Sequence, residues 1–250
     1  MKKITVLIPC YNEEKGIGKV IRGIPTEKLL KDGFKTKVVV IDNNSTDKTA
    51  EVAKKYGAIV ISEKKQGKGH AIKTGFMSIT EDTDYIVMLD GDDTYKPSEI
   101  PRLIEPLDSD FCDVIVGSRL GGKMLDGSLK TQNRIVNWGY AFLVRYFYHA
   151  NITDVLSGFF AWKRETLDGL KLHLQADGFA IEMEMITKMM KLGYEIYSVP
   201  ITYDVRQGES KISSLKDGLK ILKMLFQNLH WNPTGSKKGK FSFKIGMWQL

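Results

Sequence analysis

Short apolar runs alternate with stretches of helical spacing through the first half of the chain. The runs at residues 4–9, 37–42, 58–62 and 85–89 are rich in valine and isoleucine, as in strands buried on both faces. Between them, residues 12–24, 45–57 and 67–79 carry helical patterns, the second closed by Gly57 and capped by Ser45 or Asp47. Strands that alternate with helices predict an α/β fold with a mostly parallel sheet.

The second half has a more mixed pattern. Residues 113–119 predict another strand, and 133–149 predict a helix dense in aromatic side chains. A short strand leading into a helix is expected at 157–167, a helix ended by Gly193 at 181–193, and an extended segment at 194–205. Only the tail from residue 232 to residue 250 looks detached from this organisation.

Composition narrows the class of protein. The chain has 250 residues and a formal charge of +7, so an acidic partner such as a phosphate or an anionic lipid is plausible. Cys10 and Cys112 lack the spacing of a metal site, which favours reduced structural thiols and a cytosolic setting. Neither a signal peptide nor an apolar stretch of about 20 residues is visible, so we expect no membrane span.

Polar clusters follow three of the predicted strands. "PCYNEE" comes after the first, "DNNSTD" after the second and "DGDDTY" after the fourth. In open parallel sheets, ligands bind outside the carboxyl ends of the strands. The three clusters therefore predict one binding site at that edge.

The cluster after the fourth strand has the ligands of a metal site. Asp90 and Asp92 are two residues apart, and Gly91 between them permits a sharp turn. Hard carboxylate oxygens suit Mg²⁺ or Mn²⁺ bound together with substrate phosphates. The alternative is a solvated turn, since aspartate and glycine are common there. Asp93 is either a third ligand or a solvated residue.

The cluster after the second strand and a glycine-containing segment before the third helical pattern suit a nucleotide. Asp42 can accept hydrogen bonds from a base or ribose, or it can cap the following helix, a task that Asn44 and its neighbours can share. In "QGKGHA", two glycines at a helix start and the side chain of Lys68 predict phosphate binding through backbone amides, including that of Gly69.

Together these segments resemble a family-2 glycosyltransferase of GT-A fold. "VLIPCYNEE", "VVVIDNNSTDKT", "QGKGHAIKTGF", "MLDGDD" and "VGSR" resemble its nucleotide-sugar half. "DVLSGFFAWKRETL", "GFAIEMEM", "VPITY" and "RQGESKIS" resemble its polyprenyl-phosphate and dolichyl-phosphate branch. The match covers roughly residues 3–225, and it implies a Rossmann-like sheet flanked by helices.

The resemblance implies an inverting transfer of a hexose or N-acetylhexosamine from a nucleotide-sugar donor to dolichyl or another polyprenyl phosphate. Asp90 and Asp92 would hold Mg²⁺ or Mn²⁺, and either Glu182 or Glu184 would lie near the sugar. The nucleotide-sugar pocket would be lined by Pro9, Tyr11, Asn12, Glu13, Asp42, Asn44, Lys68, Gly69, Asp90 and Gly91. The acceptor phosphate would be held by Arg119, Arg206 and Lys211, with Arg134 as a further candidate because the family's basic residue there can be offset by a position.

One departure from the family bears on the donor. Mannose-transferring relatives have a glutamine that can join the metal shell, whereas this chain has Thr94 in "DGDDTYKP". That pattern is closer to the dolichyl-phosphate glucose synthases. It favours UDP-glucose or UDP-N-acetylglucosamine over GDP-mannose.

The segment after residue 212 suggests how the chain reaches a lipid. Apolar residues recur at helical spacing between 213 and 231, beside a stripe formed by Lys216, Lys220 and Lys223. We expect this helix and the basic tail to lie on the cytoplasmic face of a membrane. The helix can instead pack on the protein's own core, and the tail can instead bind a small membrane subunit.

The sequence thus predicts a GT-A catalytic domain at 1–212 and a membrane-surface segment at 213–250. Within the domain, 1–118 would bind the nucleotide-sugar and 119–212 the acceptor; a homo-oligomer is also compatible. One alternative is a GT-A enzyme with a soluble or polysaccharide acceptor. Another is a basic nucleic-acid-binding protein, but acidic strand-end loops would repel a phosphate backbone, so we expect no nucleic-acid partner.

Overall fold

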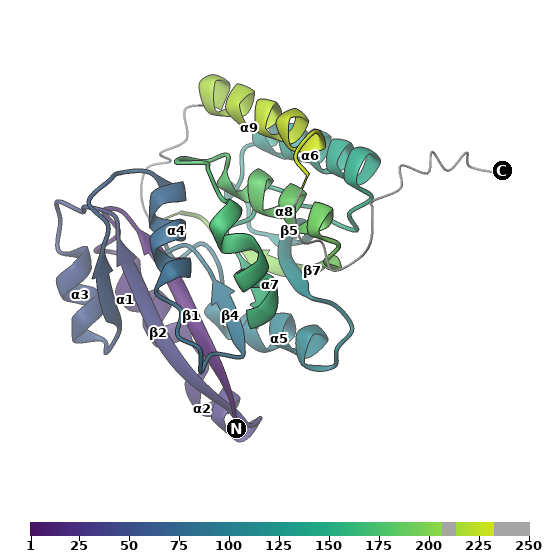
Figure 1. The fold of residues 1–250 in the computed structure, drawn as a ribbon. Helices are drawn as coiled ribbons and strands as arrows, with labels where there is room; N and C mark the ends of the chain where they lie inside the picture. Colours follow the sequence, from purple (N-terminus) through teal and green to yellow (C-terminus); the bar gives the residue numbers. More distant parts are fainter. Residues whose placement is uncertain (207–213, 233–250) are drawn as a thin grey trace.

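The computed structural model describes residues 1–206 and 214–232, and the described residues form one seven-stranded sheet with helices on both faces (Figure 1). The strand order is β3-β2-β1-β4-β6-β5-β7. The strands are β1 (Lys2–Cys10), β2 (Phe34–Asp42), β3 (Ile59–Ser62), β4 (Tyr85–Met88), β5 (Val114–Met124), β6 (Phe160–Lys163) and β7 (Ile196–Tyr203). The predicted α/β class and mostly parallel sheet are confirmed.

The exception to parallel pairing is β6, which runs antiparallel to both of its neighbours. Its first residue, Phe160, pairs with Met88 of β4 and with Val116 of β5. The residues immediately before β6 therefore lie at the carboxyl end of β4, on the edge at which the sequence predicts the binding site.

Helices cover both faces of the sheet. One apolar core lies between the sheet and α1 (Ile17–Gly23), α2 (Thr26–Lys31), α3 (Thr49–Lys55) and α5 (Ile100–Asp108). The other lies between the sheet and α4 (Lys68–Met77), α6 (Thr131–Tyr148), α7 (Arg164–Leu170), α8 (Ile181–Leu192) and α9 (Ser214–Leu229). Short 3-10 turns occur at Pro97–Glu99 and Lys171–His173.

The apolar strands are buried on both faces, as their composition predicts. Along β1, Leu7 contributes to the core under α4, whereas Val6 and Ile8 contribute to the core under α1. Two predicted helix ends are also confirmed, because Gly57 and Gly193 follow α3 and α8 with φ of 82° and 84°.

Helix α9 has one buried face and one exposed face. Ile221 and Leu225 are buried in the core, and the Tyr140 hydroxyl of α6 donates a 2.9 Å hydrogen bond to the Gly218 carbonyl. On the opposite side, 65% of Leu219 and 43% of Phe226 are exposed. The predicted packing of this helix on the protein's own core is therefore confirmed for one face, and its contact with a membrane stays a prediction. Among the described residues, no helix combines the length and apolar character needed to cross a bilayer.

Candidate functional site

A cavity of about 1000 Å³ lies at the carboxyl ends of the central strands. Its walls come from the loops after β1 and β4, the start of α4, β5, α6, α8 and the residues after β7. Many of the predicted site residues meet there: Pro9, Tyr11, Glu13, Lys68, Asp90, Gly91, Asp92, Arg119, Glu182 and Arg206.

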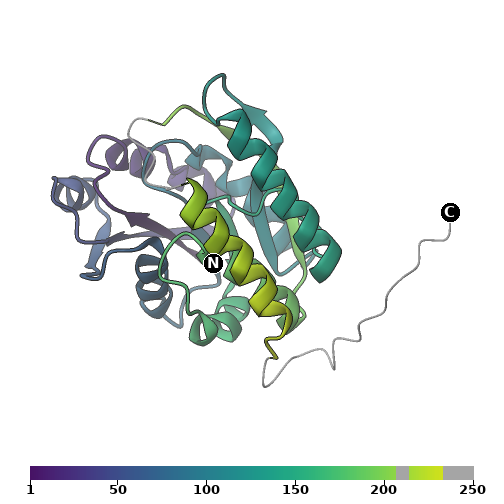
Figure 2. The same cartoon turned by 90° about the horizontal axis from the view of Figure 1, so that it is seen from above.

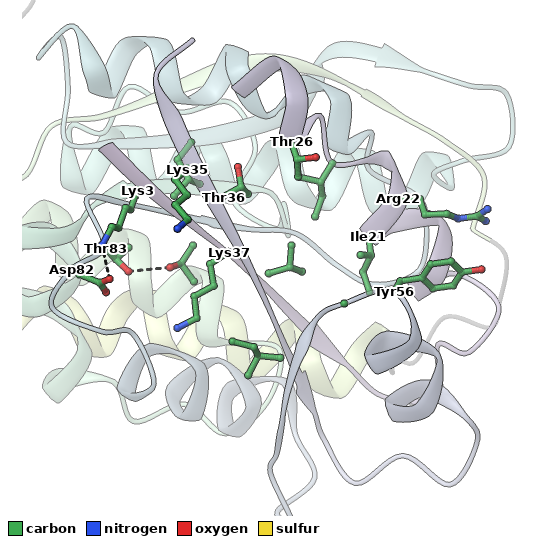
Figure 3. A pocket seen from close by; sticks show the side chains of 16 residues that line it. Lys3, Ile21, Arg22, Thr26, Lys35, Thr36, Lys37, Tyr56, Asp82 and Thr83 are labelled. Carbon is green, nitrogen blue, oxygen red and sulfur yellow. Dashed lines mark hydrogen bonds and ion pairs between the residues drawn. The ribbon is translucent and has the colours of Figure 1, made fainter. Parts of the chain in front are cut away.

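A second cavity, of about 620 Å³, lies at the opposite ends of β1 and β2 (Figure 3). It is basic, but its Lys3 is paired with Asp82 at 2.7 Å, and Arg22 lies over the ring of Tyr56. None of the predicted site residues lines it. We therefore place the candidate site in the larger cavity.

The turn after β4 places Asp90 and Asp92 by close packing. A side chain at position 91 would put its Cβ only 2.4 Å from the Cys10 sulfur, so the turn requires Gly91. Thr94 then orients Asp92: its hydroxyl and its backbone amide both donate to Asp92 Oδ1, at 2.6 and 3.2 Å. Thr94, noted in the sequence as a departure from the family, thus supports one of the two predicted metal ligands.

A cation lies against each of these two carboxylates. Lys68 Nζ is 2.9 Å from Asp90 Oδ1 and 2.7 Å from Glu182 Oε1. Arg206 Nε is 3.2 Å from Asp92 Oδ2, as an ion pair without the direction of a hydrogen bond. The site therefore alternates negative and positive groups, an arrangement suited to a ligand that carries both phosphate and metal.

Burial and charge perturb the titration of these groups. Burial, and then the negative charge of Asp90, raise the pKa of Asp92. Burial lowers the pKa of Lys68, but the charges of Asp90 and Glu182 outweigh it and raise the pKa above its usual range. Lys68 is therefore a permanent cation, which is what binding of a diphosphate requires.

The donor set fits a divalent metal whose other ligands come from substrate and water. Asp90 and Asp92 both line the cavity, and the described part of the chain contains no cluster of three or more His, Cys, Asp or Glu that would form an all-protein cage. Mg²⁺ and Mn²⁺ are commonly bound by one or two carboxylates together with phosphate oxygens. The role of Asp93 stays open, since it lies 3.7 Å from Lys19 and outside the cavity lining.

The glycine pair of "QGKGHA" has a packing role. A Cβ on Gly67 or Gly69 would lie 2.3 Å from the Asp177 carbonyl or 2.1 Å from the Ala176 carbonyl. The Gly69 amide donates to Asp177 O, and the Gly67 amide donates to the side chain of Asn43. These two amides are thus already engaged in this structure, whereas the side chain of Lys68 lines the cavity and offers a phosphate contact.

The polar residues after β1 and β2 have divided roles. Asn43 lines the cavity, and its side chain also donates to the Lys65 carbonyl at 2.6 Å. The side chains of Asn12, Asp42 and Asn44 do not line the cavity. Asn12 accepts from the Thr46 amide at 2.8 Å and Asp42 accepts from the Ser45 amide at 3.3 Å, so both hold the loop at the cavity rim.

Arg119 is buried in the cavity wall and is paired with an aspartate that the sequence did not reveal as important. Its Nε and Nη2 donate to the two oxygens of Asp154 at 2.8 and 2.9 Å, and Nη2 also donates to the Leu156 carbonyl. Asn137 of α6 donates to the same carboxylate at 2.6 Å. The long separation along the chain hides this pairing from sequence patterns.

The structure separates the two candidate glutamates. Glu182 lines the cavity beside Lys68. Glu184 lies outside the cavity lining; it accepts from the amides of Gln175 and Ala176 and pairs with Lys188 at 2.6 Å. Glu184 is fully buried, although it lies outside the cavity lining.

Two predicted acceptor contacts are not among the cavity-lining residues that the structure describes. Arg134 is exposed on α6 and does not line the cavity, whereas its neighbours Lys130, Gln132 and Asn133 do. Lys211 lies outside the described residues. Cys10 and Cys112 are buried free thiols, as predicted.

Comparison with known proteins gives a family match. The model for glycosyl transferase family 2 matches residues 5–170. The chain is 33% identical to the glycosyltransferase AglJ of Haloferax volcanii over 92% of this chain and 73% of that protein. It is 31% identical to the dolichyl-phosphate hexose transferase of the same organism over 89% and 92% of the two chains, and 30% identical to the dolichol-phosphate mannosyltransferase of Pyrococcus furiosus over 96% and 67%.

Solved structures support the fold. Glucosyl-3-phosphoglycerate synthase from Mycobacterium tuberculosis, in complex with Mn²⁺, UDP and glucosyl-3-phosphoglycerate, matches with a TM-score of 0.68 and 23% identity. The match covers 94% of this chain and 82% of that one. The GT-A fold expected from the sequence is confirmed by this likeness.

Proposed function

The chain belongs to glycosyl transferase family 2, and on that premise we propose that it transfers a hexose from a nucleotide-sugar to a polyprenyl phosphate such as dolichyl phosphate. The observation that carries the proposal is the pairing of Asp90 and Asp92 with Lys68 and Arg206 in one cavity. Two phosphorylated substrates must approach each other during this reaction, and such an encounter requires cations beside the metal ligands.

The residues that line the cavity have separate roles in the proposed reaction. Asp90 and Asp92 would hold Mg²⁺ or Mn²⁺, which supplies positive charge to the leaving diphosphate. Lys68 and Arg206 lie beside these carboxylates and stabilise the same developing charge. The acceptor phosphate is already an anion, so its oxygen attacks the anomeric carbon without a general base while the diphosphate leaves from the opposite side. Glu182 holds Lys68 in place.

The relatives favour a lipid acceptor. Proteins named dolichyl-phosphate hexose transferase and undecaprenyl-phosphate mannosyltransferase are 31% and 30% identical to this chain. We propose the same acceptor class here, reached from the cytoplasmic face of a membrane. The donor we propose is UDP-glucose or UDP-N-acetylglucosamine, on the basis of "DGDDTY".

A transfer assay tests donor, acceptor and metal together. Labelled UDP-glucose, UDP-N-acetylglucosamine and GDP-mannose would each be incubated with dolichyl phosphate and with 3-phosphoglycerate, in Mg²⁺, Mn²⁺ or a chelator. We expect label in the lipid fraction, from a UDP-sugar and only with metal. Transfer to the soluble acceptor alone would replace the proposed acceptor class, and transfer only from GDP-mannose would replace the proposed donor.

A further inference from the structure

The two predicted metal ligands are supported in different ways. Thr94 donates two hydrogen bonds to Asp92 Oδ1, at 2.6 and 3.2 Å. Among the described residues, the polar partner of Asp90 is Lys68, whose ammonium group also pairs with Glu182. An ammonium group on a four-carbon stem acts as a point charge and does not fix the direction of a carboxylate. The orientation of Asp90 therefore requires a further support.

The antiparallel pairing of β6 with β4 places Gly158 opposite Asp90. Met88 pairs with Phe160, and because the strands run in opposite directions, two residues forward from Met88 lie opposite two residues back from Phe160. The approach is close, since a Cβ on Gly158 would lie 2.3 Å from Asp90 Oδ2 and 2.8 Å from Oδ1. The backbone at Gly158 thus forms a wall against the carboxylate of Asp90.

Tyr95 holds this wall in place. The Gly158 amide donates a 2.6 Å hydrogen bond to the hydroxyl oxygen of Tyr95. Tyr95 lines the cavity but is only 1% exposed, and its ring packs edge-on against the rings of Phe159 and Tyr203, with centroids 5.7 and 5.1 Å away. Because the ring is enclosed in this way, its hydroxyl has a fixed position.

The chain just before Gly158 is held from helix α6. Asn137 Oδ1 accepts hydrogen bonds from the amides of Val155 and Leu156, each at 3.2 Å. Asn137 belongs to α6, which lies beside α9 in the foreground of Figure 2. These bonds anchor the start of the segment, and the Tyr95 hydroxyl anchors its end.

We propose that Tyr95 is a positioning residue for the metal site: through Gly158, its hydroxyl fixes the orientation of the Asp90 carboxylate. Thr94 and Tyr95 follow each other along the chain and support one metal ligand each, the first directly and the second through a neighbouring backbone. Removing a group that orients a metal ligand commonly lowers metal affinity by about 10–100-fold. The inference rests on the proposed function, because it takes Asp90 and Asp92 as the metal ligands.

The variant Tyr95→Phe tests the proposal, because it removes the hydroxyl and keeps the ring in the core. We expect Mn²⁺, followed by electron paramagnetic resonance without substrate, to bind about tenfold more weakly. Tyr148→Phe is the matched control, since it removes a fully buried hydroxyl that donates to the Leu225 carbonyl outside the cavity lining. This control should bind Mn²⁺ as the parent chain does.

Thermal unfolding separates positioning from a general loosening of the fold. Each variant loses one buried hydrogen bond, so the midpoint of both should fall by about 2–4 °C. Mn²⁺ affinity should fall only in Tyr95→Phe. An affinity in Tyr95→Phe equal to that of the parent chain would overturn the proposal, and so would an equal loss of affinity in Tyr148→Phe.

A second variant acts on the same carboxylate from the other side. In Gly158→Ala, the new Cβ requires the space that Asp90 occupies, so Mn²⁺ should bind at least as weakly as in Tyr95→Phe. Gly178→Ala is its control, since it also lies in a loop but has no atom within 4 Å of the new Cβ. Normal Mn²⁺ binding in Gly158→Ala would show that the contact with Asp90 has no effect on the metal, contrary to the proposal.

The double variant tests whether the two substitutions act by one route. Its loss of Mn²⁺ affinity should be smaller than the product of the two single losses, because either change alone already displaces Asp90. A loss equal to the product would overturn the route from Tyr95 through Gly158.

These measurements use Mn²⁺ alone, so they do not depend on the transfer of a sugar. If Mn²⁺ binding depends on Tyr95 but no nucleotide-sugar is used, the proposed function fails and the positioning role stands. A parent chain that binds no Mn²⁺ would overturn both.

Discussion

Arg206 forms ion pairs with carboxylates of two different loops. Its Nε lies 3.2 Å from Asp92 Oδ2 in the loop after β4, and its Nη2 lies 3.0 Å from Glu13 Oε1 in the loop after β1. Arg206 itself follows β7. Through this guanidinium, the residues after β7 are held against the turn that carries the predicted metal ligands. A metal and a diphosphate that bind there must compete with Arg206 for Asp92 or share it.

Asp92→Asn should reduce metal-dependent transfer about a thousandfold while leaving the protein folded, because it removes one of two anionic metal ligands. The measurement is the initial rate at saturating Mn²⁺, with the thermal midpoint as the folding check. Asp168→Asn is the matched control, since it makes the same chemical change in an ion pair outside the cavity lining. A rate in Asp92→Asn close to that of the parent chain would remove Asp92 from the metal site.

Lys68→Met should separate metal binding from turnover. Without the ammonium 2.9 Å from Asp90, Mn²⁺ alone should bind about tenfold more tightly, because a repelling charge is gone. Turnover should nevertheless fall, because a cation beside the leaving diphosphate is lost. Mn²⁺ affinity would be followed by electron paramagnetic resonance without substrate, and weaker binding in the variant would contradict the proposed competition.

Asp154→Asn should destabilise the fold by about 3–5 kcal/mol at neutral pH, since it leaves Arg119 buried without its carboxylate partner. Urea unfolding measures this loss. The same change in an exposed pair, Asp168→Asn beside Arg164, should cost less than about 1 kcal/mol. Similar losses in the two variants would show that the Arg119–Asp154 pair contributes no more than a surface ion pair.

The acid stability of the chain should depend on the same pair. Burial opposes ionisation of Asp154, but the charge and hydrogen bonds of Arg119 outweigh it and lower the pKa below the usual 3.8. Because the folded-state pKa is the lower one, the stabilisation is complete above pH 3.8 and is lost as the pH falls towards the folded value. The unfolding free energy of Asp154→Asn should therefore change less with pH in this range than that of the parent chain.

Gly69→Ala should destabilise the chain by about 1–3 kcal/mol, because the new Cβ would meet the Ala176 carbonyl at 2.1 Å. Gly139→Ala is the comparison, since it also lies within a helix but has no atom within 4 Å of the new Cβ. That variant should be stabilised by up to about 1 kcal/mol, because alanine favours a helix more than glycine does. Thermal unfolding checks both, and a neutral Gly69→Ala would show that the neighbouring loop gives way easily.

Periodicity predicted the strands and their shared edge well, because β1, β2 and β4 carry near-continuous apolar runs that end in polar clusters. The meeting of Asp90 and Asp92 with Glu13 in one cavity follows from that edge. Periodicity could not distinguish Glu182 from Glu184, because both lie on a helix buried on nearly all sides.

The pairing of side chains that lie far apart along the chain also could not be predicted from the sequence. Arg119 and Asp154 are 35 positions apart, and only the antiparallel placement of β6 brings them together. The packing role of Gly69 was hidden for a similar reason, since the carbonyl that it approaches belongs to a loop more than a hundred residues away. The amphipathic pattern of α9 predicted an apolar stripe there, but three well-exposed aromatic side chains, Trp138, Phe142 and Tyr146, lie on α6, where aromatic density alone did not indicate their direction.

The position of β6 between β4 and β5 also governs the order in which the sheet can be completed during synthesis. Until residues 160–163 leave the ribosome, β4 has only β1 as a partner, and its other edge stays open. Residues 89–159, nearly thirty per cent of the chain, must therefore be made before the two halves of the sheet are joined. The nascent chain is thus most prone to aggregate in the interval before β6 is synthesised, and co-translational chaperones should matter most in that interval.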